Sequence, residues 1–225
     1  MPKIKNKIIR ILLIVGILLF ISGGVLVYAY YKESTQYNNW NNNGEFPVIK
    51  KPAVYLYPTE KLNITVKVVI NGSIINSKPK YNEGWDVMGE PNGIINGTYD
   101  YLFYEARLNK LLLPSEGWIV KYENLNNWFK VYLSKLGLNS KEITQFKDYW
   151  LKELPKAKYY EIKLLDDTFL KENMDLQIYP KPTTLIRRNL YFKPHNSTIT
   201  LQEPYIVSPE RKGFTVVEWG GLLGK

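Results

Sequence analysis

The chain has 225 residues, which is enough for one domain of ordinary size and an additional short segment. It contains no cysteine and one histidine, His195, so disulfide bonds, thiol nucleophiles and histidine-rich metal sites are excluded. The net charge is +9, but residues 1–32 hold five basic side chains and no acidic one, and the remaining charge forms no long basic run. Because nucleic-acid-binding proteins concentrate positive charge on one face, we expect no nucleic-acid partner.

An uncharged segment near the N-terminus predicts a transmembrane helix. Residues 11–31 are mostly Ile, Leu, Val and Gly, and about 20 such residues span a bilayer as a helix. Four basic residues precede this segment, so the positive-inside rule predicts a cytoplasmic N-terminus and an external C-terminal part. A signal peptide cleaved after Ala29 is the alternative, although the apolar region of signal peptides is usually only about 7–15 residues long. Both interpretations place the rest of the chain outside the cytoplasm.

The sequence divides into three regions. Residues 1–31 form the predicted cytoplasmic N-terminus and transmembrane anchor, which would have the lipid bilayer as its partner through residues 11–31. Residues 32–50 are rich in Asn and poor in apolar side chains, which indicates a flexible tether. Residues 51–225 are the predicted extracytoplasmic globular domain.

The first part of this domain has the periodicity of β-strands. Apolar and polar residues alternate over residues 62–70, which predicts a half-buried strand. Asn71-Gly72 is a two-residue hairpin signal, so we expect residues 73–75 to turn back beside that strand. Residues 84–97 contain several Gly, Pro and Asn turn signals, and residues 99–107 predict the next strand.

The middle of the domain has the periodicity of two helices. The first predicted apolar face comprises Leu125, Trp128, Phe129, Tyr132, Leu133 and Leu136. Gly137 is a helix-ending residue, and Asn139 with Glu142 has the spacing of a capping box that begins a second helix. The second predicted face comprises Ile143, Phe146, Trp150, Leu151 and Leu154, and Pro155 ends it. We therefore predict an αα-hairpin whose Trp128 and Trp150 are buried.

Strand character returns after the helices. The predicted strands are residues 159–165, 174–179, 185–192, 198–201 and 214–219. Many neighbouring strands joined by turns favour a mainly antiparallel sheet with the helix pair on one side. The predicted fold class is therefore α+β, preceded by the N-terminal transmembrane helix.

Six motifs together resemble those of an uncharacterised family of exported and membrane-anchored bacterial and archaeal proteins. They are Lys51-Pro-Ala-Val-Tyr-Leu-Tyr-Pro58, Tyr81-Asn-Glu-Gly-Trp-Asp-Val87, Tyr99-Asp-Tyr-Leu-Phe-Tyr-Glu-Ala106, Leu136-Gly-Leu138, Phe146-Lys-Asp-Tyr-Trp150 and Gly213-Phe-Thr-Val-Val-Glu-Trp-Gly-Gly221. The resemblance extends over residues 51–221. It implies a shared fold and export, and it supplies no activity.

Two acidic residues interrupt apolar strand faces. Glu105 shares a face with Tyr101 and Phe103, and Glu218 lies in the last predicted strand. An apolar environment disfavours the ionised form of a carboxyl group, which suits a general acid, and two such groups across a cleft are the minimum for glycoside hydrolysis. The structural alternative is that each glutamate pairs with a buried arginine; Arg107, Arg187 and Arg188 are available, and Arg187 is the first candidate for a shared partner.

The remaining candidates concern binding. Trp85, Trp118 and Trp219 offer flat surfaces on which sugar rings can stack, and Arg187 is a candidate for the same site. His195 lies in a segment with the composition of a surface turn. No motif for a nucleotide, another cofactor or a metal is present. Four glycosylation sequons occur, at Asn63, Asn71, Asn96 and Asn196, but the sequence does not determine whether they carry glycans.

The absence of a catalytic signature favours a single-pass membrane protein with a non-enzymatic external domain that binds an envelope polymer or protein. The alternative is an extracytoplasmic glycan hydrolase that uses Glu105 and Glu218. An accessory subunit of a larger membrane complex is a third interpretation. The sequence identifies neither a ligand nor an oligomeric state.

Overall fold

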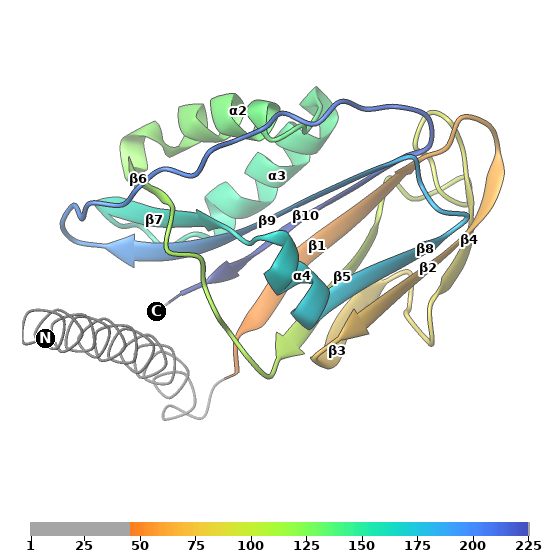
Figure 1. The fold of residues 1–225 in the computed structure, drawn as a ribbon, viewed down its shortest axis with the longest axis horizontal. Helices are drawn as coiled ribbons and strands as arrows, with labels where there is room; N and C mark the ends of the chain where they lie inside the picture. Colours follow the sequence, from red (N-terminus) through yellow and green to blue (C-terminus); the bar gives the residue numbers. More distant parts are fainter. Residues whose placement is uncertain (1–45, 225) are drawn as a thin grey trace, which may run out of the picture. The chain divides into compact units, whose positions relative to one another are not determined.

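A computed structural model describes residues 46–224, and residues 46–225 belong to one compact unit. The predicted transmembrane helix and residues 32–45 of the predicted tether lie outside the described residues. Between residues 46 and 224, no helix is both long and apolar enough to span a membrane. The described unit is α+β with mostly antiparallel sheets, as the sequence predicts (Figure 1).

A seven-stranded sheet forms the centre of the unit, in the order β3-β5-β1-β10-β9-β7-β6. Its strands are β3 (Gly72–Lys78), β5 (Leu102–Leu108), β1 (Val48–Tyr57), β10 (Thr215–Leu223), β9 (Thr184–His195), β7 (Tyr159–Leu164) and β6 (Trp118–Lys121). All neighbours are antiparallel except β9 and β10, which are parallel. Parallel neighbours need a crossover connection, and residues 196–214 provide it by passing over the helices (Figure 1).

A smaller sheet packs against one face of the central sheet. It has the order β4-β2-β8, with β4 (Trp85–Gly89), β2 (Leu62–Ile70) and β8 (Met174–Tyr179), and the short helix α4 (Asp167–Asn173) precedes β8. The indole of Trp85 lies 6.4 Å from the ring of Tyr104 on β5, and Arg187 on β9 donates to the Met174 carbonyl at 2.6 Å. These contacts join the two sheets.

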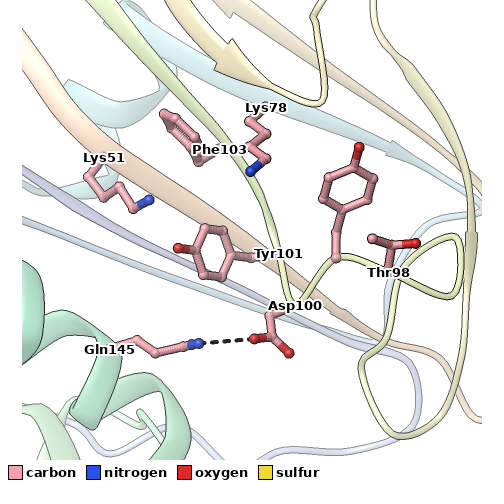
Figure 2. A pocket seen from close by; sticks show the side chains of 8 residues that line it. Lys51, Lys78, Thr98, Asp100, Tyr101, Phe103 and Gln145 are labelled. Atoms are coloured by element: carbon pink, nitrogen blue, oxygen red, sulfur yellow. Dashed lines mark hydrogen bonds between the residues drawn. The ribbon is translucent and has the colours of Figure 1, made fainter.

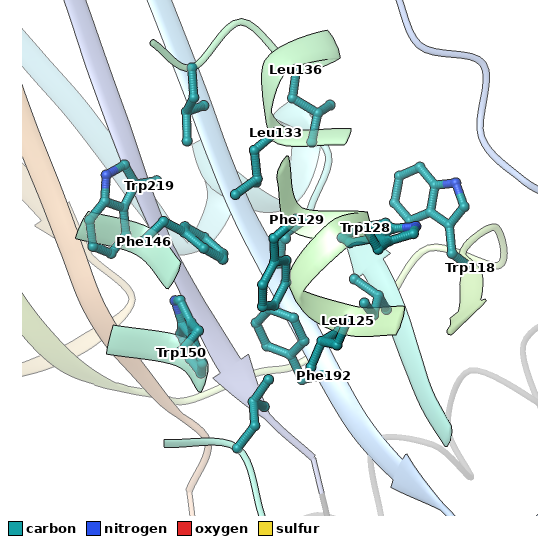
Figure 3. Close-up of a cluster of buried hydrophobic side chains, with 14 of the residues drawn as sticks. Trp118, Leu125, Trp128, Phe129, Leu133, Leu136, Phe146, Trp150, Phe192 and Trp219 are labelled. Carbon is teal, nitrogen blue, oxygen red and sulfur yellow. The ribbon is translucent and has the colours of Figure 1, made fainter. Parts of the chain in front are cut away.

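The other face of the central sheet is covered by α2 (Leu125–Lys135) and α3 (Ser140–Glu153), which follow a short 3-10 turn (Tyr122–Asn124). Figure 3 shows the aromatic core between the helices and the sheet. Trp150 is fully buried, with its ring 4.7 Å from that of Phe192, and Trp128 stacks on Tyr132. The predicted burial of both tryptophans is confirmed.

Local signals explain the helix boundaries. Gly137 has φ +93°, a left-handed conformation that glycine adopts at little cost, and it follows the end of α2. The Asn139 side chain accepts from the backbone N–H of Glu142, and the Glu142 side chain accepts from the backbone N–H of Asn139. The predicted helix stop and capping box are therefore confirmed.

The predicted hairpin at Asn71-Gly72 is wrong. β2 belongs to the small sheet, whereas β3 pairs with β5 in the central sheet, so the chain crosses between layers at this point. A Cβ atom on Gly72 would lie only 1.9 Å from the carbonyl oxygen of Arg107. Glycine is needed here because two backbones approach closely, and not because a tight hairpin turn requires it.

Other differences are local. Residues 84–87, predicted as a turn, include the start of β4, where Trp85 and Val87 are buried and Asp86 is exposed. Residues 198–201, predicted as a strand, have no regular structure and belong to the crossover. The first strand begins at Val48, so the folded unit starts before the predicted boundary at residue 51. The sequence interpretation also missed α4 and β6, which are short.

Candidate functional site

Glu218 lies in a buried polar network between the two sheets. One carboxylate oxygen accepts from the Tyr104 hydroxyl at 2.9 Å. The other accepts from Arg187 Nε at 2.7 Å and from Asn189 Nδ2 at 3.0 Å. Glu218 is completely buried, and Arg187 is nearly so. The arginine pairing expected for each glutamate is therefore confirmed for Glu218, with Arg187, and is wrong for Glu105, which forms no salt bridge within residues 46–224.

The charges within this network compensate one another. Burial alone would lower the pKa of Arg187, but the adjacent Glu218 carboxylate raises it, and the net shift is upward. Burial and then the Glu218 charge raise the pKa of the Tyr104 phenol, which keeps it a hydrogen-bond donor. A buried ion pair held by these hydrogen bonds is a structural arrangement, although the side-chain oxygen of Asn189 has no hydrogen-bond partner among the described residues. It offers no open position for a ligand.

Glu105 lies on the opposite face of the same sheet. It follows Tyr104 on β5, and successive side chains of a strand point to opposite faces. Its carboxylate accepts from Asn76 Nδ2 at 3.2 Å. Burial raises the pKa of Tyr149 on α3, and the charges of Glu153 and Glu105 raise it further. The sheet therefore separates Glu105 from Glu218. The two carboxylates are not brought together across a cleft.

The three tryptophans singled out in the sequence are core residues. Trp85, Trp118 and Trp219 are at most 3% exposed. Trp118 packs edge-on against Trp128, and Trp219 packs against Phe146. None of these indoles presents a face on which a sugar ring could stack.

His195 is the last residue of β9 and not part of a surface turn, because β9 continues three residues beyond the predicted strand. Its Nε2 lies 2.8 Å from a carboxylate oxygen of Glu161, whose other oxygen is 3.3 Å from the ammonium group of Lys163. Within residues 46–224, no group of three or more His, Asp or Glu side chains is arranged to hold a metal ion.

A surface cavity lies on the helix-facing side of the central sheet, where β1, β3 and β5 approach α3. Its volume is about 330 Å³. It is lined by Lys51, Lys78, Thr98, Tyr99, Asp100, Tyr101, Phe103 and Gln145. Figure 2 shows the two lysines above, Tyr101 in the middle, and Asp100 with Gln145 below. We call this site the lysine–aromatic pocket.

A β-bulge in β1 directs Lys51 into the lysine–aromatic pocket. The pairing of β1 with both neighbours shifts between residues 49 and 53, and Lys51 has φ +56°. The Lys51 ammonium lies 4.1 Å from the ring centre of Phe103 and 4.7 Å from that of Tyr101. Left-handed backbone in a lysine is strained, and such strain often accompanies functional sites.

The last strand accommodates this bulge. Gly220 on β10 lies opposite the bulge, and a Cβ atom there would be 2.8 Å from the backbone of Pro52. The motifs at the two ends of the domain are therefore neighbours in the sheet, and together they produce the backbone that positions Lys51.

Hydrogen bonds hold the opposite side of the pocket. Asp100 accepts from Lys141 at 2.6 Å and from Gln145 Nε2 at 3.3 Å. The Tyr55 hydroxyl donates to Gln145 Oε1 at 2.7 Å and accepts from Trp219 Nε1 at 3.2 Å. This chain of bonds connects the core to the pocket and fixes the orientation of the Gln145 amide.

The lysine–aromatic pocket has a positive electrostatic balance. In the part of the chain that the structure describes, neither Lys51 nor Lys78 forms a salt bridge, whereas Asp100 is paired with Lys141. Two ammonium groups beside aromatic rings can bind an anionic ligand. Cation–π contact keeps the Lys51 side chain in place and leaves its charge without an acidic partner.

Sequence reasoning did not identify this pocket, although two signals were present. Pro52 follows Lys51 between two apolar segments, residues 46–49 and 53–57, and proline in a central strand indicates a bulge. Tyr99, Tyr101 and Phe103 alternate along one segment and therefore share a face. The sequence does not indicate that Lys78 on β3 and Gln145 on α3 lie beside these residues in the folded domain.

Comparison with known proteins supplies no relative: no protein-family model matches the chain, and neither curated proteins nor solved structures give a significant match. The family resemblance of the six motifs therefore stays a prediction.

Proposed function

We propose that this protein is a membrane-anchored, non-enzymatic binding module whose ligand site is the lysine–aromatic pocket. The observation that carries the proposal is the pair of ammonium groups of Lys51 and Lys78, which line the pocket and form no salt bridge with any of residues 46–224. The ligand belongs to the cell envelope, as either a polymer or a neighbouring protein. The positive charge of the pocket favours an anionic one.

The distribution of acidic residues supports binding over hydrolysis. Glycoside hydrolysis by two carboxylates needs both groups on either side of one bond, about 5–9.5 Å apart. Glu105 and Glu218 lie on opposite faces of a packed sheet, and Glu218 is fully engaged by three donors. The accessory-subunit interpretation is a form of the same proposal in which the ligand is a protein.

A capture experiment tests the binding function. The intact chain is solubilised in detergent, attached to a resin and incubated with a solubilised envelope fraction. The polymers and proteins that the resin retains are then identified. The Lys51→Met/Lys78→Met double variant should lose the retained species, because it removes both charges and preserves the length of the side chains. Lys80→Met is the matched control, since Lys80 is exposed near Lys78 but does not line the pocket. Equal retention by all three proteins would remove the pocket from the function.

The location of the domain is part of the proposal, and it derives from the uncharged segment at residues 11–31 and its basic flank. Because the chain has no cysteine, single cysteines can be introduced without background. A cysteine in place of Ser34 should react with a membrane-impermeant thiol reagent on intact cells, whereas one in place of Asn6 should not. Labelling at position 6 alone would reverse the proposed topology.

A further inference from the structure

The lining of the lysine–aromatic pocket is specific enough to define a ligand class. We infer that the pocket binds an acidic sugar, meaning a hydroxylated ring that carries a carboxylate or phosphate group, as one residue of a longer polymer. This inference rests on the proposed binding function and adds the chemical class of the ligand. Three parts of the pocket carry it: the two lysines, the aromatic wall and the Asp100–Gln145 pair.

The two lysines account for the anionic group. Lys51 comes from the bulge in β1, and Lys78 is the last residue of β3, so two separate strands direct ammonium groups to one cavity. Neighbouring Lys50 uses its charge differently, since it binds Glu153 of α3 at 2.7 Å. Lys51 contacts aromatic rings instead, at 4.1 and 4.7 Å from their centres. Its charge is therefore available to a carboxylate or phosphate.

The aromatic wall accounts for the ring. Tyr101 and Phe103 form the part of the wall beside Lys51, and Tyr99 also lines the pocket. Aromatic side chains combine a flat apolar surface with a polar edge, which suits the apolar C–H face of a sugar. A volume of about 330 Å³ lies at the lower end for ligand pockets, so it fits one sugar residue and not an extended oligomer.

The Asp100–Gln145 pair accounts for the hydroxyl groups. An ionised carboxylate offers about four acceptor positions, and Lys141 and Gln145 occupy two of those on Asp100. The remaining positions can accept from ligand hydroxyls. Burial raises the pKa of Tyr55 far above its ordinary value, so its hydroxyl stays protonated and keeps donating to Gln145 Oε1. The Gln145 amide nitrogen is thereby held toward Asp100.

Matched pairs of ligands test this class by isothermal titration calorimetry on the full chain. The chain is kept in a polyoxyethylene detergent, which carries no sugar headgroup. Trigalacturonate is compared with its methyl ester, in which each carboxylate is replaced by a neutral ester, and glucose 6-phosphate is compared with glucose. Hexaglutamate provides negative charge without sugar hydroxyls. We expect at least one of the two acidic sugars to bind about tenfold more tightly than its neutral partner. The difference comes from charge-assisted hydrogen bonds between the lysine ammonium groups and the carboxylate or phosphate of the ligand. Which of the two does so distinguishes a carboxylate ligand from a phosphate ligand.

Variants then locate the binding. Lys78→Met should weaken binding of the preferred acidic sugar about tenfold, whereas Lys80→Met should leave it unchanged. Asp100→Ala gives a more discriminating result because it removes a negative charge. A purely electrostatic pocket would bind the anion more tightly after this change, whereas loss of a hydroxyl acceptor weakens binding. Weaker binding is the expected result.

The outcomes separate this inference from the proposed function. Equal binding of acidic and neutral sugars, or binding of hexaglutamate as tight as that of the acidic sugars, would overturn the sugar-acid class. If Lys78→Met still weakened the binding in either case, the pocket would remain a binding site for another ligand. Failure of all five probes would also overturn the class, and the capture experiment would then decide the proposed function independently.

Discussion

Replacing Glu218 with Gln removes the negative charge of the buried network with almost no change in shape. Gln can place its carbonyl oxygen near Arg187 and Asn189, but the Arg187 guanidinium is then a buried cation without a counter-charge. Removing one partner of a buried ion pair typically costs about 3–5 kcal/mol. We therefore expect Glu218→Gln to lower the free energy of unfolding by about this amount, because Glu218 is the one acidic side chain within residues 46–224 that forms a salt bridge with Arg187, and Asp175 acts on it only from a greater distance.

The assay is thermal and urea unfolding of residues 46–225, followed by tryptophan fluorescence. For a domain of this size, about 1 kcal/mol corresponds to a change of roughly 2–4 °C in Tm, so the expected decrease is about 6–20 °C. Glu105→Gln is the matched control. Its carboxylate has one exposed hydrogen bond, to Asn76, and the change should cost less than about 0.5 kcal/mol.

A second variant separates loss of charge from loss of packing. The double change Arg187→Met/Glu218→Leu removes both charges, and it should restore much of the stability that Glu218→Gln loses, since apolar replacement of a whole buried pair is often neutral. If Glu218→Gln unfolds at the same temperature as Glu105→Gln, the reasoning about the buried network is refuted.

Three further predictions concern the helices and the buried phenols. Trp150→Ala should cost about 3–5 kcal/mol because the indole is completely buried against Phe192, whereas Tyr205→Ala, at a side chain 91% exposed, should leave Tm unchanged. Asn139→Ala should cost about 1 kcal/mol by removing the capping box, and Asn124→Ala should cost almost nothing because Asn124 makes no side-chain cap bond; equal losses in urea unfolding would contradict this. Burial raises the pKa of Tyr160 to about 12 and also raises that of Tyr191. Unfolded tyrosines ionise near pH 10, so the stability from these groups is complete below about pH 10 and is lost as the pH rises through the folded values. Tyrosinate absorbance should therefore appear together with loss of the folded circular dichroism signal, and ionisation of all tyrosines near pH 10 in an intact fold would disprove it.

The helix pair could be predicted from the sequence because its signals are local. The spacing of apolar residues, the capping box at Asn139 and the glycine at position 137 all act within a few residues of the elements that they define. The pairing of Glu218 with Arg187 was also predictable, since a carboxylate on an apolar strand face needs a buried partner.

The remainder depends on contacts between distant segments. Asn71-Gly72 has the composition of a hairpin, but the chain crosses between two sheets there because Gly72 must approach the backbone of β5. The pocket combines a bulge in β1, the end of β3, residues 98–101 before β5, one residue of β5 and one residue of α3. Periodicity places each side chain on a face of its own element, and it does not determine which elements become neighbours.

NMR of the full chain with ¹³C-dimethylated lysines tests the central claim most directly, because dimethylation preserves the lysine charge and reports each ammonium group separately. The Lys51 methyl signal should be displaced before ligand is added, since its nitrogen lies 4.1 Å from the centre of the Phe103 ring. On addition of the preferred acidic sugar, the signals of Lys51 and Lys78 should shift with one binding curve while that of Lys80 stays constant. Unchanged Lys51 and Lys78 signals during measurable binding would contradict the account and place the ligand elsewhere on the protein.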